Sequence, residues 1–328
     1  MAATSSTPAV AVGQPVADRP AAKDAPSARR TGLGIALSLV SFATFGTSGV
    51  FASALLDAGW TAAGAVTVRV GIAAAVLTAP ALLALRGRTH AMRRSWRPVL
   101  AYGVVAVAAC QVAYFYAVQH LSVGVALLLE YLGAVLVVLW MWLRHGHRPG
   151  PLTIAGAALS VGGLVLVLDV FGGVRIDVVG VLFGLAAAAG LATFFVLGAH
   201  SDDDLPPIAM AWAGLTIGTA CLLGAGAVGA VPLATPRVDV TFLGHAVSWL
   251  WPALGLSLLA AVVAYTTGIT GSRILGARFS SFLGLTEVLF AVTFAWLLLG
   301  EALTPLQLAG GVVILGGVAL VKLAEKPS

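Results

Sequence analysis

Hydrophobic residues in this chain fall into long runs, and polar residues gather in short segments between them. Each run is about 18 to 24 residues long, which is the length that a helix needs to cross roughly 30 Å of hydrocarbon. The pattern therefore predicts an all-α, polytopic membrane protein with ten transmembrane helices. These are expected at residues 32–52, 62–85, 98–119, 123–143, 151–170, 178–199, 208–231, 248–270, 279–299 and 305–322.

The distribution of basic residues orients these helices. If the N-terminus is cytoplasmic, segments on the inner side hold fifteen of the eighteen Lys and Arg residues, while Arg175 and Arg237 lie outside and Arg69 lies within a span. Cytoplasmic loops of membrane proteins carry such an excess of Lys and Arg. The charge pattern thus predicts that both termini are cytoplasmic, whereas an odd number of spans would place Lys322 and Lys326 outside.

The two halves of the chain resemble each other. Residues 153–168 align without gaps with residues 307–322 at an offset of 154, and Glu130 corresponds to Glu287 at an offset of 157. Five spans in each half mean that the second copy enters the membrane in the opposite orientation, an arrangement typical of secondary transporters. The predicted organisation is a disordered cytoplasmic tail (1–31), a first repeat (32–170), an extracytoplasmic linker (171–177), a second repeat (178–322) and a cytoplasmic tail (323–328).

Composition narrows the class of protein further. The chain is 59% hydrophobic and only 9% charged, whereas about 25% of the residues in a soluble domain are charged. Its pI is near 9.6 because Lys and Arg residues gather in the predicted cytoplasmic segments. They do not form a continuous basic patch, so no nucleic-acid partner is expected. Cys110 and Cys221 both lie within apolar runs and are interpreted as small hydrophobic residues.

Ionisable residues inside the predicted spans are the first functional candidates. Arg69, Glu130 and Glu287 each lie on a stripe of small residues, so they are expected to face the bundle rather than lipid. Arg69 and Glu130 are predicted at similar depth and could pair. Two interpretations stay open for them, a structural ion pair and a direct role with substrate or a proton.

A structural or coupling role is favoured for Glu287, with Arg273 and Arg278 as candidate partners at the cytoplasmic end. Other polar residues share helix faces and could line a substrate pathway, although Ser and Thr in membrane helices often bond to their own backbone. These residues are Ser41, Thr44 and Ser48, then Gln111 and Tyr114, and then Tyr265, Thr266 and Thr270.

No arrangement typical of an enzyme stands out. The acidic segment HSDDD at residues 200–204 lacks the second acidic cluster that metal-dependent chemistry on a lipid-linked substrate would need. The glycines lie mostly inside spans and form no phosphate-binding loop. We therefore expect no catalytic residue, cofactor or metal.

Several segments resemble the EamA repeats of the drug/metabolite transporter superfamily. The first half carries the resemblance through YFYAVQHLSVGVALLLEYLGAVLVVLWMWL and IAGAALSVGGLVLVLD, and the second through AYTTGITGSRILGARFSSFLGLTEVLFAVTFAWLLLGE and LAGGVVILGGVALVK. The pattern GVALLLEYLG and the spacing from Tyr265 to Glu287 look most like the threonine/homoserine exporter group. Ala134 and Val288 stand where this family often has proline, which predicts straighter helices here.

The resemblance implies ten helices in an inverted five-plus-five arrangement, a central cavity and export of small metabolites without ATP hydrolysis. We accordingly expect a secondary transporter in the cytoplasmic (inner) membrane that exports amino acids or similar small polar metabolites by alternating access. The alternatives are export of a hydrophobic drug or another metabolite, and a membrane-embedded enzyme acting on a lipid-linked substrate. The expected partners are a small-molecule substrate and the lipid bilayer; proton coupling through Glu130 and the oligomeric state stay open.

Overall fold

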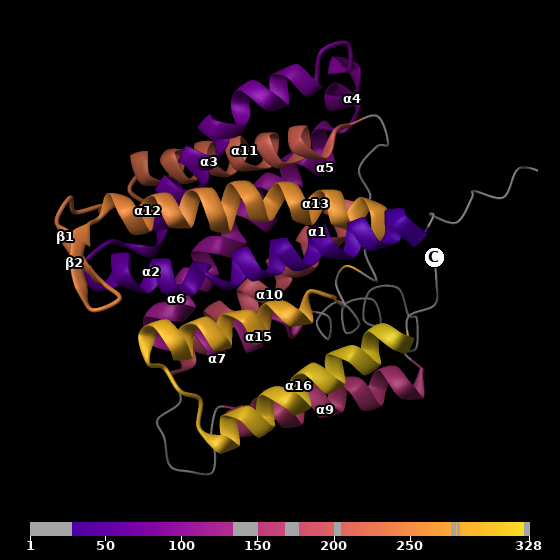
Figure 1. The fold of residues 1–328 in the computed structure, drawn as a ribbon, viewed down its shortest axis with the longest axis vertical. Coiled ribbons are helices and arrows are strands. Elements are labelled where there is room, and N and C mark those ends of the chain that lie inside the picture. Colours follow the sequence, from indigo (N-terminus) through magenta and orange to yellow (C-terminus); the bar gives the residue numbers. More distant parts are fainter. Residues whose placement is uncertain are drawn as a thin grey trace, which may run out of the picture.

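A computed structural model describes residues 28–133, 150–167, 177–199, 205–276, 280 and 283–324. The tail of residues 1–27 and the segment 134–149 lie outside the described residues, so the expectations for them stay predictions. The described chain is mostly helical, and its longer helices run side by side across the molecule (Figure 1).

Each of the ten predicted spans overlaps a helix. The helical elements are α1 (Ala28–Gly46), α2 (Ser48–Asp57), α3 (Ala62–Ala84), α4 (Thr89–Arg94), α5 (Trp96–Ala101), η1 (Tyr102–Ala109), α6 (Cys110–His120), α7 (Val123–Glu130), α9 (Pro151–Val167), α10 (Val178–Ala199), α11 (Pro207–Ala227), α12 (Leu250–Ser257), η2 (Leu258–Val263), α13 (Ala264–Leu275), α15 (Leu285–Phe294), η3 (Ala295–Leu299) and α16 (Pro305–Ala324), where η marks a π-helix.

Six helical segments in the described part of the chain are long and apolar enough to cross a membrane. Three further helices, Pro151–Val167, Leu285–Leu299 and Pro305–Val321, are apolar but shorter. The chain is therefore a multi-pass membrane protein, while the number of ten spans and the side of the termini stay predictions. Helix α1 begins at Ala28, four residues before the predicted span, because a helix can continue into water with its backbone bonds intact.

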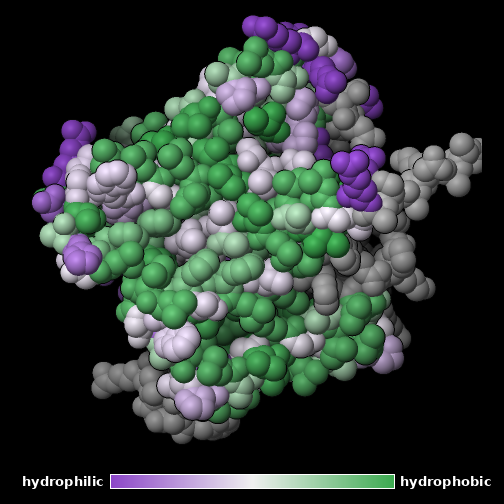
Figure 2. Space-filling view, viewed as in Figure 1, coloured by the Kyte–Doolittle hydropathy of each residue, from purple (hydrophilic) through white to green (hydrophobic). Residues whose placement is uncertain are grey.

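The surface matches a lipid environment. Many large apolar side chains are exposed, including Val312, Leu182 and Leu297. Figure 2 shows a broad hydrophobic face over the helices, with polar residues gathered at the two ends and around α4. Such a surface would be unfavourable in water and is stable in hydrocarbon.

The all-α expectation was wrong for one segment. Strands β1 (Asp239–Phe242) and β2 (His245–Ser248) form an antiparallel hairpin, whose turn residues Leu243 and Gly244 both have positive φ. Two such residues are typical of the tight turn that joins twisted antiparallel strands. Helix α11 accordingly ends at Ala227, short of the predicted residue 231.

The hairpin is attached to the end of the α2–α3 region. The rings of Phe51 and Phe242 stack with their centroids 5.4 Å apart. The indole N–H of Trp60 donates to the carbonyl of Pro236 at 2.8 Å, and the hydroxyl of Thr61 donates to that of Pro232 at 2.6 Å. The connection between α11 and α12 is therefore an ordered cover over one end of the bundle.

Helix contacts relate the two halves of the chain. Helix α1 packs on α13 and α15, while the corresponding helix of the second half, α10, packs on α6 and α7. Helix α3 packs on α11, and α9 packs on α16. Each contact thus has a counterpart in which the roles of the two halves are exchanged.

Helices α9 and α16 lie side by side (Figure 1), and their glycines show this exchange at single residues. A Cβ on Gly156 would lie 2.6 Å from the carbonyl oxygen of Gly317, and one on Gly163 would lie 2.7 Å from that of Gly310. Gly310 and Gly317 are the equivalents of Gly156 and Gly163 at the offset of 154. Small residues let helix backbones approach this closely in a membrane.

We expect Gly163→Ala to destabilise the protein, because the new methyl group would meet backbone atoms that cannot move aside. Overpacking of this kind costs about 1–3 kcal/mol. Gly162→Ala is the matched control, since a Cβ there has nothing within 4 Å. Thermal unfolding in detergent measures both variants, and equal melting temperatures would contradict the close packing of α9 on α16.

The junction between the halves is held by Asp177, directly before α10. One carboxylate oxygen accepts the backbone N–H of Gly180 at 3.0 Å, and the other lies 2.9 Å from the Nδ1 of His120 at the end of α6. The Gly180 N–H, followed by His120, lowers the pKa of Asp177. An acidic residue at a helix N-terminus also interacts favourably with the helix dipole.

A lowered native pKa means that ionised Asp177 stabilises the folded state above its unfolded pKa of about 3.9, and that this contribution is lost as the pH falls through the native value. Asp177→Asn should therefore lower the melting temperature at pH 7, and the difference from wild type should shrink only below about pH 4. Asp239→Asn, an exposed change in β1, is the control. A difference that stays constant from pH 7 to pH 3 would rule out this role for the charge.

Candidate functional site

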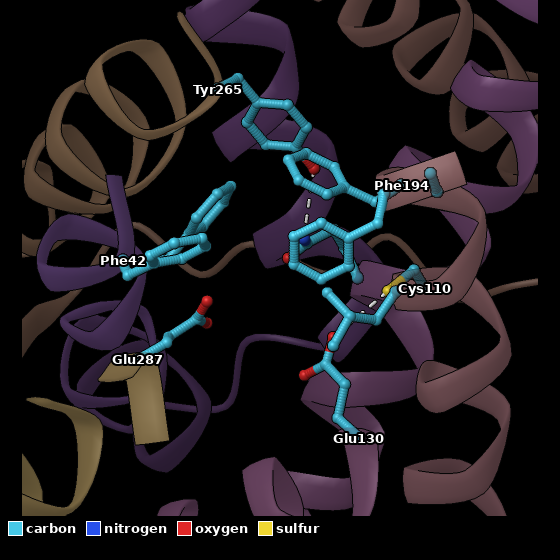
Figure 3. Close-up of a pocket in the computed structure, with 11 residues that line it drawn as sticks. Phe42, Cys110, Glu130, Phe194, Tyr265 and Glu287 are labelled. Carbon is cyan, nitrogen blue, oxygen red and sulfur yellow. Dashed lines mark hydrogen bonds between the residues drawn. The ribbon is translucent and has the colours of Figure 1, made fainter. Parts of the chain in front are cut away.

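A cavity lies inside the bundle between helices of both halves. The first half contributes residues of α1, η1, α6 and α7, and the second half contributes residues of α10, α13 and α15. The lining residues are Phe42, Phe45, Ala106, Cys110, Gln111, Glu130, Leu191, Phe194, Phe195, Tyr265 and Glu287 (Figure 3).

Two carboxylates face this cavity from opposite sides (Figure 3). Glu130 is the last residue of α7 and is only 7% exposed. Its Oε1 accepts the thiol of Cys110 at 3.4 Å, and its Oε2 has no hydrogen bond to the described residues. Glu287 lies in the first turn of α15, and its Oε2 accepts the hydroxyl of Tyr131 at 3.1 Å.

Arg69 lies beside the cavity and is 1% exposed. Its Nη1 donates to Ser48 Oγ at 2.8 Å and to Gln111 Oε1 at 2.6 Å, and its Nη2 donates to the carbonyl of Ala260. Ala260 belongs to the π-helix η2, a kind of segment that is frequent at functional sites. The guanidinium also lies near two aromatic rings, 5.9 Å from the Phe45 centroid and 5.8 Å from that of Phe115.

The expected pairing of Arg69 with Glu130 is not found. Within the described residues no salt bridge joins them, and the guanidinium bonds to neutral groups instead. The sequence placed both residues at a similar depth but could not give the rotation of their helices. Arg69 thus connects the first half of the chain to η2 in the second half.

The polar candidates separate into two groups. Gln111 bridges Arg69 and Tyr265, since its Nε2 donates to the Tyr265 hydroxyl at 3.2 Å. Ser41 donates to the carbonyl of Ala264 at 2.7 Å and so joins α1 to α13. Ser48 accepts from Arg69, as described above. These residues connect separate helices around the cavity.

The remaining hydroxyl candidates bond to backbone carbonyls three or four residues before them in the chain. Thr44 donates to the carbonyls of Val40 and Ser41, Thr266 donates to those of Val262 and Val263, and Thr270 donates to that of Thr266. Tyr114 is buried beside Phe115 but does not line the cavity.

Of the two expected partners of Glu287, Arg273 forms no salt bridge with it among the described residues, and its guanidinium donates to the carbonyl of Leu205. Arg278 lies outside those residues. Tyr131 bonds to Glu287 instead, because the end of α7 packs beside α15.

The phenylalanines of the cavity wall were not predicted from the sequence, whereas Tyr265 was. Phe45 lies 5.1 Å from Tyr265 and 6.0 Å from Phe194, and Phe194 lies 5.3 Å from Phe195, all between ring centroids. Apolar rings in a membrane helix carry no signal that separates a cavity wall from a lipid-facing surface. Cys110 was also missed, since its contact with Glu130 joins residues on different helices.

Comparison with known proteins identifies the family. The EamA-like transporter family matches residues 32–169 and again residues 178–323. This chain belongs to the EamA-like transporter family. The two matched regions together cover most of the chain, so the family extends over both halves that form the cavity.

Individual relatives of this EamA-like transporter agree with that result. A protein from Archaeoglobus fulgidus described as an uncharacterized transporter is 28% identical over 208 residues, which are 63% of this chain and 70% of that protein. A protein crystal structure at 21% identity covers 88% of this chain and 96% of its own, with a TM-score of 0.59, and so has a similar fold. The chain is thus a membrane transporter.

We expect Arg69→Ala to destabilise this EamA-like transporter strongly. The change leaves two buried acceptors, on Ser48 and Ala260, and a half-buried one on Gln111 without their donor, at about 1–3 kcal/mol for each buried group that stays unsatisfied. Arg86→Ala, at an exposed position, is the control. Thermal unfolding in detergent should separate the two variants, and similar melting temperatures would show that Arg69 does not hold the helices together.

Proposed function

We propose that this EamA-like transporter is a secondary transporter that exports amino acids or similar small polar metabolites by alternating access. It lies in the cytoplasmic membrane with both termini inside, and it binds its cargo in the cavity that contains Glu130 and Glu287. The resemblance to the threonine/homoserine exporter group supports cargo that carries an amine.

The observation that carries this proposal is that Glu130 and Glu287 face one cavity. The two residues are equivalents at an offset of 157, and they lie on helices of different halves. Secondary transporters with inverted repeats bind substrate where the repeats meet, near the middle of the membrane. A cavity lined by both halves therefore supports transport through this site.

The helix contacts support an inverted repeat. Gly156 contacts Gly317, and Gly163 contacts Gly310, so each contact is the other with the equivalent residues of the two halves exchanged. A two-fold axis between antiparallel helices produces this pattern. The counterpart contacts of α1 and α10 follow the same exchange. In an alternating-access cycle, two such halves move against each other around the binding site.

The carboxylates also support proton coupling. Acidic residues inside membrane spans form proton relays in many pumps and transporters. Neither Glu130 nor Glu287 has a salt bridge within the described part of the chain, so each can exchange a proton for positively charged cargo. The aromatic wall favours a second candidate function, export of a hydrophobic drug, because apolar rings bind apolar surface.

The proposal is tested by comparing metabolites in the medium and cytosol of cells with and without the protein. We expect a selective rise of one class of amine-bearing metabolite in the medium, and proteoliposomes should show that its transport depends on a pH gradient. Glu130→Gln should abolish that dependence, because the amide cannot bind and release a proton.

Asp57→Asn, an exposed change at the end of α2, is the matched control and should transport like wild type. Accumulation of the metabolite inside cells would reverse the proposed direction. Coupling that survives in Glu130→Gln would exclude Glu130 as the proton carrier.

A further inference from the structure

The cavity carries an excess of negatively charged groups, which a zwitterionic amino acid, with no net charge, would not balance. Among the described residues, its lining includes two carboxylates and no Lys, Arg or His. Arg69 is close by, but its Nη donors are engaged by Ser48, Gln111 and Ala260. With both glutamates ionised, two negative charges stand against the single positive charge of Arg69, so one further cation would balance the site.

Each carboxylate keeps one oxygen available toward the cavity. Cys110 bonds to Oε1 of Glu130, and Tyr131 bonds to Oε2 of Glu287. The second oxygen of each has no hydrogen-bond partner among the described residues, although Glu130 is more than nine-tenths buried. Two acceptor oxygens on opposite sides of one space are suited to the N–H groups of an ammonium.

The rest of the wall suits a cation with an apolar body. The rings of Phe45, Phe194 and Tyr265 lie within 5.1 to 6.0 Å of one another between centroids. Aromatic ring faces attract ammonium groups, most strongly where water is excluded. Figure 3 shows the rings of Phe42, Phe194 and Tyr265 around the space that the two carboxylates enter.

A free carboxylate on the cargo would be disfavoured in the same place. It would lie among Glu130, Glu287 and ring faces, all of which repel negative charge, with the side chains of Gln111 and Tyr265 as the polar groups left to it. Juxtaposed like charges at a binding site cost several kcal/mol and act against the wrong ligand.

We propose that the cavity selects monovalent organic amines, in which one ammonium and an apolar or aromatic body are present without a carboxylate. Glu130 and Glu287 bind the ammonium, and the rings of Phe45, Phe194 and Tyr265 bind the body. This inference rests on the proposed transport function and narrows its cargo, amino acids or similar small polar metabolites, to amines that carry no carboxylate.

Three probes with the same phenyl ring and different charge test the selection. β-Phenylethylamine is a cation, phenylalanine is a zwitterion and 3-phenylpropionate is an anion. Isothermal titration calorimetry on the full-length protein in nanodiscs should show that the amine binds at least about tenfold more tightly than the other two, the gain that one charge-assisted hydrogen bond can give.

The variants Glu130→Gln and Glu287→Gln should each weaken amine binding by about tenfold or more, while Asp57→Asn should leave it unchanged. Thermal unfolding confirms that each variant is folded. If one of the two glutamate variants does not fold, the other still tests the proposal. Phenylalanine binding that equals or exceeds amine binding, amine binding that both glutamate variants retain, or no binding of the amine would each overturn the proposal. Failure of the proposed transport function gives a different result. The amine would still bind to the purified protein, but the metabolites in medium and cytosol would be the same in cells with and without the protein.

Discussion

The structure depends on how a buried positive charge is satisfied in a bilayer. Without water, every polar group inside the membrane needs a partner within the protein. Arg69 obtains its partners from three separate helices, through Ser48, Gln111 and the carbonyl of Ala260. The guanidinium therefore fixes the relative positions of those helices, and the aromatic cavity with its two carboxylates is built beside this connection.

This arrangement also explains why the carboxylates can serve in transport. A direct Arg69–Glu130 ion pair would hold the carboxylate in a fixed geometry, and breaking such a buried pair is costly. The Nη groups of Arg69 bond to neutral groups, and Glu130 makes its contact through the thiol of Cys110, which is a weak donor. A ligand or a proton can then replace that contact at small cost.

Sequence analysis predicted the positions of the helices, the equivalence of Glu130 with Glu287, and the importance of Arg69 and Gln111. Long apolar runs and intramembrane charges are strong signals, since the bilayer penalises exceptions. The partners of these charges were not predictable, because they depend on the rotation and the π-helical segments of neighbouring helices. The hairpin at Asp239–Ser248 was missed since only a short alternating pattern between turn residues marks it.

The symmetry of the scaffold does not extend to the chemistry of the cavity. Tyr131 follows Glu130 and bonds to Glu287, whereas Val288 stands after Glu287 and can bond to no carboxylate. Two of the bonds between the halves around the cavity, Tyr131–Glu287 and Gln111–Tyr265, join side chains that can both rotate to new partners. The contact of α9 with α16 is made through glycine backbones that have no side chain to rearrange. If the halves rock against each other during transport, these two side-chain bonds can break and form again with other partners. The closely packed pair α9–α16 is suited to remain the axis of that movement.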